Sequence, residues 1–445
     1  MNRFIKWMEE HFVPIAAKIG GQRHLVAIRD GFVALMPLVM AGSLAVLLNN
    51  VFFTPASLIA DWFNLKPETS GYLQFTTKYL QPLMGNIWWG TFAVLSLVLV
   101  FTVAYSLAKS YDVNPLSAAV VAVAGFLALT PQGVTITLAD GKTTQGTWGN
   151  FGWQYFNFGA LLTAIIVTLV ITQIFVFLMK KNLTIKLPDN VPPAVGRAFS
   201  AIIPGLVAII VGAFVPVLFT MLNEAKILVE TNLFDLITKF ITDPFMHLSQ
   251  NPFSAIIYVL MIQVLWFFGL HGGNMMGAIT NAIYLPQVAA NASGGHNVFT
   301  SVFFDSFVHL GGAGATLALV IAIFIASKRR DYREISKIGG AASLFQINEP
   351  IMFGLPVVLS PILIIPFMIV PVVLTLTAYV ATVTGFIGYT NVVVPWVTPV
   401  GLSAFLSTSG DIKAALVAII NLAIAVVIYY PFIKLANRHE SEKVS

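Results

Sequence analysis

Glu349 is the side chain in this 445-residue chain whose setting most clearly suggests chemistry. It lies in Gly339-Gly-Ala-Ala-Ser-Leu-Phe-Gln-Ile-Asn-Glu-Pro-Ile-Met-Phe-Gly354, where Pro350 and the neighbouring glycines prevent an uninterrupted helix. A carboxylate at the centre of a membrane helix costs about 2.5–3.5 kcal/mol on insertion scales, and broken backbone is tolerated there only inside protein or beside a cavity. Glu349 therefore predicts a polar pocket. The alternative is a structural carboxylate that caps the ends of the broken backbone.

Two further segments carry residues that could bind a polar ligand. His271 lies in Trp266-Phe-Phe-Gly-Leu-His-Gly-Gly-Asn274. A lone histidine is usually a packing residue, but the glycines on both sides favour a functional role, with Asn274 as a further candidate contact. Trp396 lies in Asn391-Val-Val-Val-Pro-Trp-Val-Thr-Pro399. Its ring could stack on the apolar face of a sugar or lie in the aromatic belt of a membrane surface, and the sequence favours neither.

Other polar motifs predict little chemistry. Asp305 and His309 are four residues apart, so on a helix they share one face and can pair, which favours a structural role. Gly125 to Pro131 and Gly311-Gly-Ala-Gly314 are not followed by the Lys-Ser/Thr of a phosphate-binding loop. The chain has no Cys, and its seven histidines lack metal-ligand spacing. We expect neither a metal site nor a cofactor.

The composition indicates that a membrane surrounds these residues. Charged residues make up 10% of the chain, against about 25% in a soluble protein. Charge-free windows of about 20 residues, enough to cross roughly 30 Å of hydrocarbon, recur along the chain. They are Gly31–Phe53, Asn86–Ala108, the second half of Thr143–Met179, Ala198–Asn223, Ser306–Ser327 and Ala414–Phe432. Two further tracts, Pro244–Phe304 and Pro350–Gly410, run 61 residues without a charge, so each must fold back as two spans or as a span with a re-entrant hairpin.

The basic residues predict an orientation. Seventeen of the 24 Lys and Arg residues fall in four clusters beside the apolar tracts, at 3–29, 180–197, 328–337 and 434–443. Because basic residues near span ends mark the cytoplasmic side, we expect both termini in the cytoplasm and an even number of crossings, about ten. The net charge of +5 does not indicate a nucleic-acid partner, because the bases flank the spans. The expected fold class is an all-α polytopic membrane protein.

Two amphipathic stretches are expected to lie in the membrane interface. Residues 3–19 and 224–243 each place apolar side chains mostly on one helical face, and Pro244 is expected to end the second helix. For the first, a packing helix on the cytoplasmic side is the alternative. The basic, proline-containing segment 180–197 is expected to link two halves. These are residues 1–190, extending to 222 at most, and residues 191–438, followed by a cytoplasmic tail at 439–445.

The sequence resembles the enzyme IIC permeases of the bacterial phosphotransferase system, in the lactose/cellobiose/N,N'-diacetylchitobiose branch. Three elements carry the resemblance: Phe345-Gln-Ile-Asn-Glu-Pro-Ile-Met-Phe-Gly354, Gly-Leu-His271-Gly and Val-Pro-Trp396. The similarity extends from Gly31-Phe-Val-Ala-Leu-Met-Pro37 to Tyr430-Pro-Phe432. It implies a bacterial cytoplasmic membrane protein with ten transmembrane helices, two re-entrant hairpins and interfacial helices. It also implies an N-terminal half with a homodimer contact and a C-terminal half that holds the sugar.

The resemblance implies roles for single residues. Glu349 and His271 match the carboxylate and the histidine that engage the sugar hydroxyl to be phosphorylated, so they are the candidate catalytic pair. Asn348 and Trp266 match neighbouring contact positions. Trp396 matches an aromatic residue that stacks on the sugar.

These residue types suit phosphoryl transfer to a primary alcohol, which must be positioned and must lose its proton. The implied donor is a phosphocysteine on a separate IIB protein, so sugar phosphorylation occurs only with that partner. The prediction is group translocation of a disaccharide, and the resemblance alone favours cellobiose or a related β-diglucoside. The alternatives are a proton-coupled secondary sugar transporter, with Glu349 as the proton carrier, and a passive channel or receptor. The chain holds few membrane-embedded acids for a proton relay.

Overall fold

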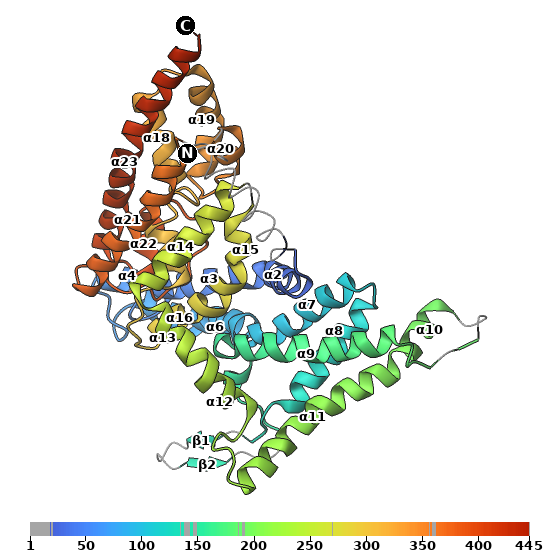
Figure 1. The fold of residues 1–445 in the computed structure, drawn as a ribbon. Coiled ribbons are helices and arrows are strands. Elements are labelled where there is room, and N and C mark those ends of the chain that lie inside the picture. The colour runs from blue at the N-terminus through green and yellow to red at the C-terminus, as the bar shows by residue number, and fades with distance from the viewer. Residues whose placement is uncertain are drawn as a thin grey trace. The chain divides into compact units, whose positions relative to one another are not determined.

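The computed structural model describes residues 18, 21–133, 135–137, 143–145, 149–185, 187–188, 192–268, 270–355, 357 and 362–444. Within this part, helices dominate and the strands form one short hairpin. The chain divides into two compact units (Figure 1). Unit 1 contains Gly42–Ile87 and Met246–Ser445, and unit 2 contains Gly21–Ala41 and Trp88–Phe245. The amphipathic stretch expected at residues 3–19 lies almost wholly outside the described residues.

Six described helices are long and apolar enough to cross a membrane. They are Met36–Phe53, Gly71–Ser110, Phe158–Lys180, Val195–Glu224, Ile364–Val383 and Ile412–Asn437. The pair Leu233–Ser249 and Pro252–Phe267, bent by 85°, would form a seventh broken span or a re-entrant element. Pro115–Leu129 and Thr316–Ala326 are shorter apolar helices. The predicted all-helical, multi-pass class is confirmed, whereas the number ten stays a prediction because short and broken helices cannot be counted by length alone.

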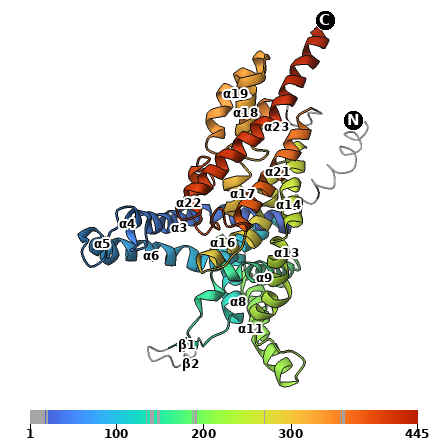
Figure 2. The ribbon, with the colours of Figure 1, turned by 90° about the vertical axis from the view of Figure 1, so that its left-hand side faces the viewer.

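Unit 2 is a bundle of apolar helices with a small β-hairpin. Its elements are α2 (Arg23–Ala34), η3 (Phe92–Val94), α7 (Leu95–Ser110), α8 (Pro115–Leu129), β1 (Thr135–Thr137), β2 (Thr143–Gln145), η4 (Trp153–Tyr155), η5 (Phe158–Ala160), α9 (Leu161–Lys180), α10 (Pro193–Ser200), α11 (Ile202–Glu224), α12 (Leu233–Ile237) and η6 (Thr238–Thr242). The strands pair antiparallel, with Ile136 opposite Thr144. Helices α7, α8, α9 and α11 pack side by side (Figures 1 and 2).

Close glycine contacts show that α8 and α11 run in the same direction. A Cβ on Gly205 would lie 3.0 Å from Cγ2 of Val121, and one on Gly212 would lie 2.6 Å from the carbonyl oxygen of Gly125. A later residue of α11 therefore contacts a later residue of α8. Only a residue without a side chain permits the second approach, as small residues generally do between membrane helices. The two helices consequently begin at the same end of the bundle.

Unit 1 contains the longest helix and most of the short, broken ones. Its elements are η1 (Asn49–Phe53), α4 (Leu58–Trp62), α5 (Gly71–Phe75), η2 (Thr76–Leu80), α14 (Pro252–Phe267), α15 (Gly272–Ile279), η7 (Thr280–Tyr284), α16 (Leu285–Ala292), α17 (Ser301–Phe307), α18 (Thr316–Ala326), α19 (Arg330–Ser343), α20 (Glu349–Gly354), α21 (Ile364–Val383), α22 (Leu402–Ser407) and α23 (Ile412–Val444). Helices α18 and α21 pack against α23 (Figures 1 and 2). Three helices cross from one unit to the other: α3 (Met36–Leu48), α6 (Gln81–Gly90) and α13 (Asp243–Ser249).

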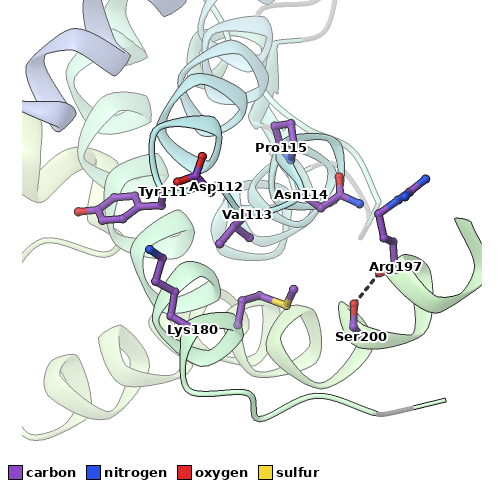
Figure 3. A pocket seen from close by; sticks show the side chains of 9 residues that line it. Tyr111, Asp112, Val113, Asn114, Pro115, Lys180, Arg197 and Ser200 are labelled. Atoms are coloured by element: carbon purple, nitrogen blue, oxygen red, sulfur yellow. Dashed lines mark hydrogen bonds between the residues drawn. The ribbon is translucent and has the colours of Figure 1, made fainter. Parts of the chain in front are cut away.

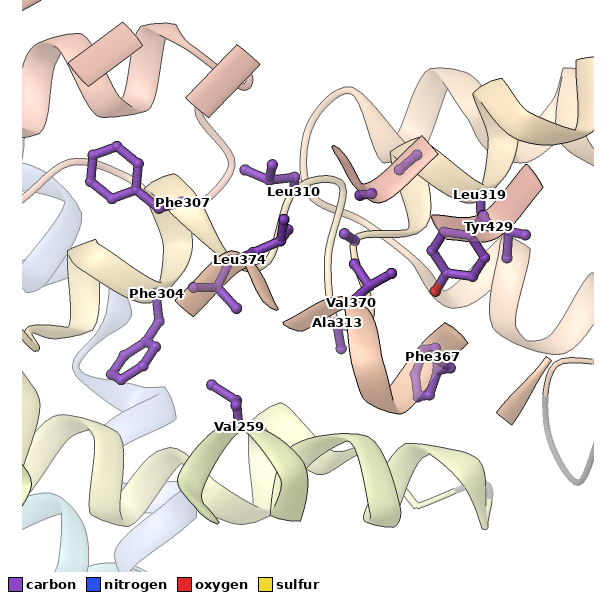
Figure 4. Packing of buried hydrophobic residues seen from close by; sticks show 14 of the residues in the cluster. Val259, Phe304, Phe307, Leu310, Ala313, Leu319, Phe367, Val370, Leu374 and Tyr429 are labelled. Carbon is purple, nitrogen blue, oxygen red and sulfur yellow. The ribbon is translucent and has the colours of Figure 1, made fainter. Parts of the chain in front are cut away.

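The core of unit 1 encloses a break between α17 and α18. Figure 4 shows Phe304, Phe307 and Leu374 packed on one side of this break, and Phe367 and Tyr429 on the other. Buried carbonyl groups need partners when no water reaches them. Polar side chains of α23 supply these partners.

Two side chains of α23 donate hydrogen bonds to carbonyl groups at the break and in α21. Asn421 donates from Nδ2 to the carbonyl oxygen of Phe307 at 3.0 Å and to that of Leu374 at 3.2 Å. The hydroxyl of Tyr429 donates to the carbonyl oxygen of Gly314 at 2.7 Å. The charge-free window Ser306–Ser327 is therefore not one continuous span, because its glycines adopt positive φ and end the helix.

The stretch 224–243 is not one helix, because α11 ends at Glu224 and α12 begins only at Leu233. The helix that begins there also does not end at Pro244, contrary to expectation. The π-helical turn η6, Thr238–Thr242, directly precedes the proline, and α13 continues to Ser249. In a π-helical turn the backbone hydrogen bonds join residues five apart instead of four. A different carbonyl group then faces the position where proline lacks its N–H, and the helix can continue beyond Pro244. Whether this stretch lies in an interface stays a prediction, as does the division of the chain into functional halves near residue 190.

Candidate functional site

His271 is held at the start of α15 by its own ring. The residue is the N-cap of the helix, and its Nδ1 accepts a hydrogen bond from the backbone N–H of Asn274 at 3.0 Å. A ring nitrogen that accepts from an N–H carries no proton, so in the neutral imidazole the proton is on Nε2. The helix start also needs Gly272, because a Cβ there would lie 2.2 Å from the carbonyl oxygen of Ile262 in α14.

Glu349 opens α20 and contacts His271 across 78 positions of sequence. Pro350 occupies the first turn of this helix, where its missing N–H costs nothing. The Nε2 of His271 lies 3.1 Å from Oε1 of Glu349. Because Nδ1 is already an acceptor, Nε2–H donates and the carboxylate accepts. The side chains are 39% and 43% exposed, so a ligand can reach both.

The segment before Glu349 is fastened to the break between α17 and α18. Gln346 has a φ of 65°, and its Oε1 accepts from the backbone N–H groups of Gly311 at 2.6 Å and Gly312 at 3.1 Å. Asn348 is almost fully buried, and its Nδ2 donates to the carbonyl oxygen of Ala313 at 3.3 Å. Two broken segments thus satisfy each other's backbone groups and fix where α20 begins.

One of the two candidate tryptophans lies against the pair. Trp266 is buried, and the centroid of its ring lies 4.4 Å from that of His271 and 6.0 Å from that of Phe353. Trp396 is 41% exposed. Its loop is joined to Gln346, whose Nε2 donates to the carbonyl oxygen of Thr398 at 3.5 Å.

The structure therefore brings some predicted residues together and leaves others apart. Glu349, His271 and Trp266 form one cluster, and Asn274 joins it through its backbone N–H, while its side chain is exposed. Among the described residues, neither a hydrogen bond nor a ring contact joins Trp396 to this cluster. The functional roles of all these residues stay predictions.

The expected pairing of Asp305 with His309 is wrong for the described part of the chain, which contains no hydrogen bond or ion pair between them. Helix α17 ends at Phe307, so His309 lies beyond it and the two residues do not share a helix face. The Nδ1 of His309 is buried without a partner among the described residues. Asp305 instead accepts at its backbone carbonyl from Gln346 at 3.3 Å.

Gln346 is a residue of the site that sequence reasoning missed. It joins its own segment to the break between α17 and α18 and to the loop of Trp396, but the sequence analysis assigned it no role. Its position among glycines in an apolar stretch was the available signal, because a buried amide there must find several partners. No group of three or more potential metal ligands lies together in the described part of the chain.

Comparison with known proteins now gives the family. A family described as "Phosphotransferase system, EIIC" matches residues 29–371 of this chain. The chain belongs to this EIIC family. It is 36% identical over 505 aligned residues to the PTS system cellobiose-specific EIIC component of Lactococcus lactis subsp. lactis (strain IL1403), with both chains covered in full. It is also 36% identical to the cellobiose-specific EIIC component of Geobacillus stearothermophilus, over 99% of this chain and 96% of the relative.

A solved structure has the same fold. The EIIC chain superposes with a TM-score of 0.88 on the transporter ChbC, the IIC component from the N,N'-diacetylchitobiose-specific phosphotransferase system. The two are 30% identical, and the match covers 98% of this chain and 99% of the other. As a phosphotransferase-system EIIC protein, the chain is a multi-pass sugar permease of the bacterial cytoplasmic membrane that works with a IIB partner.

Proposed function

We propose that this EIIC protein binds and translocates a disaccharide, cellobiose or a related β-diglucoside, and presents its 6-hydroxyl to phospho-IIB. The hydrogen-bonded pair of His271 and Glu349 is the observation that carries this proposal, since it combines a carboxylate, an imidazole and access for a ligand. The choice of sugar is supported by two full-length relatives named cellobiose-specific at 36% identity.

The proposed chemistry follows from the atoms that the pair leaves available. The contact with His271 uses Oε1 of Glu349, so Oε2 can accept a hydrogen bond from the 6-hydroxyl. As the hydroxyl oxygen attacks phosphorus, the new O–P bond forms and the S–P bond to the IIB cysteine breaks. The hydroxyl proton passes to Glu349, and the cysteine leaves as thiolate. His271 positions the carboxylate and stabilises its charge.

Of the remaining candidates, two would bind the sugar and two would position the reacting pair. Trp396 is proposed to stack on a sugar ring, because its exposed face can cover apolar C–H groups. Trp266 supports the imidazole ring from behind, and Asn348 holds the start of α20. For Asn274 we propose a direct contact through its exposed side-chain amide.

A basic helix adjoins the proposed centre. Helix α19 packs against α20, and Gly339 lies close to Ile351. Arg329 donates to Asp331, and its guanidinium lowers the pKa of that carboxyl. With further bases from Lys328 to Lys337, this segment is proposed to dock the phosphorylated partner by opposite charge. We further propose a homodimer through the N-terminal half and termini in the cytoplasm.

Uptake into proteoliposomes tests the proposed function. The purified chain is reconstituted into vesicles with its cytoplasmic face inward, phospho-IIB is enclosed in them, and labelled cellobiose is added outside. We expect labelled phosphosugar to accumulate only when phospho-IIB is present. Uptake abolished by a protonophore alone would identify proton coupling instead, and equilibration without accumulation would identify a passive channel. Binding of a disaccharide panel to the purified chain then decides the sugar, and a clear preference for another disaccharide would overturn the cellobiose assignment.

A further inference from the structure

A pocket lies wholly within unit 2, where the ends of several helices meet. It has a volume of about 610 Å³ and opens to the surface. The turn from α7 to α8 forms one side, and the end of α9 with the second half of α10 forms the other (Figure 3). Its lining residues are Tyr111, Asp112, Val113, Asn114, Pro115, Met179, Lys180, Arg197 and Ser200. None of these residues takes part in the proposed sugar chemistry.

The charge of this pocket is predominantly positive. Lys180 and Arg197 line it from two different helices (Figure 3). The Nζ of Lys180 lies 5.5 Å from the ring centroid of Tyr111, and the guanidinium carbon of Arg23 lies 4.8 Å from it. The lining thus holds two cations and one carboxylate, that of Asp112, and Arg23 adds a third cation beside the lining residue Tyr111. Among the described residues, neither Lys180 nor Arg197 forms an ion pair.

The position of the pocket along the helices is that of a membrane surface. One candidate span, Phe158–Lys180, ends at the pocket, and another, Val195–Glu224, begins there. Cationic side chains at span ends lie among lipid headgroups, where they meet phosphate groups. A ligand at this depth can therefore have a polar part in the pocket and an apolar part along the spans.

Apolar surface continues from the pocket along α8 and α11. Leu116 and Val120 are exposed on one face of α8, and Ile202 and Leu206 are exposed on one face of α11, each pair four residues apart. Because α8 and α11 start at the same end of the bundle, both exposed rows begin beside the pocket. The cations and the apolar rows together match an amphiphile with an anionic head.

We infer that this pocket binds the headgroup of an anionic phospholipid, specifically one with hydroxyl groups, such as phosphatidylglycerol. The phosphodiester accepts hydrogen bonds from Lys180 and Arg197, and the acyl chains cover the apolar rows of α8 and α11. Asp112 accepts a hydrogen bond from a headgroup hydroxyl, which gives the single carboxylate of the pocket a partner. A soluble phosphate would leave the apolar rows uncovered.

Native mass spectrometry of the purified full-length chain tests this site by titration with phosphatidylglycerol. One basic residue near an anionic headgroup changes affinity by roughly fivefold, so Lys180→Gln together with Arg197→Gln is expected to weaken binding about 30-fold. Lys181→Gln is the matched control. Lys181 is the next residue, is also exposed and lies over Phe177, but does not line the pocket. For a comparison at equal charge, Lys180→Gln alone is set against Lys181→Gln. Equal losses in these two single variants would refute the site and leave only general attraction between bases and lipid.

Two measurements on the unaltered chain keep the test independent of whether the variant folds. Phosphatidylglycerol is expected to bind at least tenfold more tightly than phosphatidylcholine or phosphatidylethanolamine. Equal affinity for the three lipids would overturn the inference. Inorganic phosphate at the same concentration is expected not to displace the lipid. Displacement by phosphate would assign the pocket to a soluble anion instead.

Discussion

Replacing Glu349 by glutamine separates the charge of the proposed base from its shape. The amide Oε1 of glutamine can still accept the hydrogen bond that His271 Nε2 donates at 3.1 Å, so the α15–α20 contact should survive. The variant loses the negative charge and the ability to take a proton. Because a charge-assisted hydrogen bond is about twice as strong as a neutral one, whose net worth is roughly 1 kcal/mol, sugar affinity should fall about fivefold.

The rate of phosphoryl transfer should fall much further than the affinity. General-base catalysis contributes about 10²–10⁴-fold, so the Glu349→Gln variant should lose that factor in a single turnover. The assay mixes phospho-IIB with the chain saturated by labelled cellobiose and follows phosphosugar over time, while equilibrium binding is measured separately. Cellobiose must be saturating so that the fivefold loss of sugar affinity does not lower the measured rate of phosphoryl transfer.

Glu68→Gln is the matched control for this substitution. Glu68 is exposed in unit 1, and the substitution makes the same chemical change away from the pair. It should alter neither the binding nor the rate. If Glu349→Gln retains a single-turnover rate within threefold of the parent chain, Glu349 is not the base and the reasoning from the pair is refuted.

Three further substitutions test how the site is built. Trp396→Ala should weaken disaccharide affinity roughly tenfold without lowering the melting temperature, because the ring is 41% exposed; unchanged affinity would return it to the aromatic belt. Gly272→Ala should destabilise the chain by about 1–3 kcal/mol and slow phosphotransfer, because its Cβ meets the Ile262 carbonyl. Gly277→Ala, one turn on in the same helix with open space around it, is the control in both thermal unfolding and transfer assays. Gln346→Ala should cost about 2–4 kcal/mol in denaturation, because two buried backbone N–H groups lose their acceptor; unchanged stability would show that the glycine break holds without it.

The helix interruptions that carry the site could be predicted from the sequence, but the residues that form hydrogen bonds with them could not. Pro350 and the glycines near His271 marked both interruptions, because these residue types stop helices wherever they occur. The hydrogen bonds of Gln346 to Gly311 and Gly312 depend on how two segments meet in space, and periodicity carries no information about that. The contact between His271 and Glu349 was expected from family resemblance, and its geometry came only from the fold.

Errors of the sequence analysis have local causes. Pro244 was expected to end a helix, but a π-helical turn before it lets the helix continue. Asp305 and His309 were placed on one helix face because the spacing of four was applied beyond Phe307, where α17 ends. Predictions of spans from long charge-free windows were more accurate. Ala198–Asn223 was predicted as a span and corresponds closely to the helix Val195–Glu224, even though Pro216 lies inside it.

The backbone N–H that meets Nδ1 of His271 also limits where protons can travel. A histidine passes a proton onward by taking it at one ring nitrogen and releasing it from the other. Here one nitrogen is already occupied by the amide of Asn274, so a proton that arrives at Nε2 must leave from Nε2. The imidazole is thus the end point of any proton path and not a passage through the protein. A transporter driven by a proton gradient would need another route to Glu349.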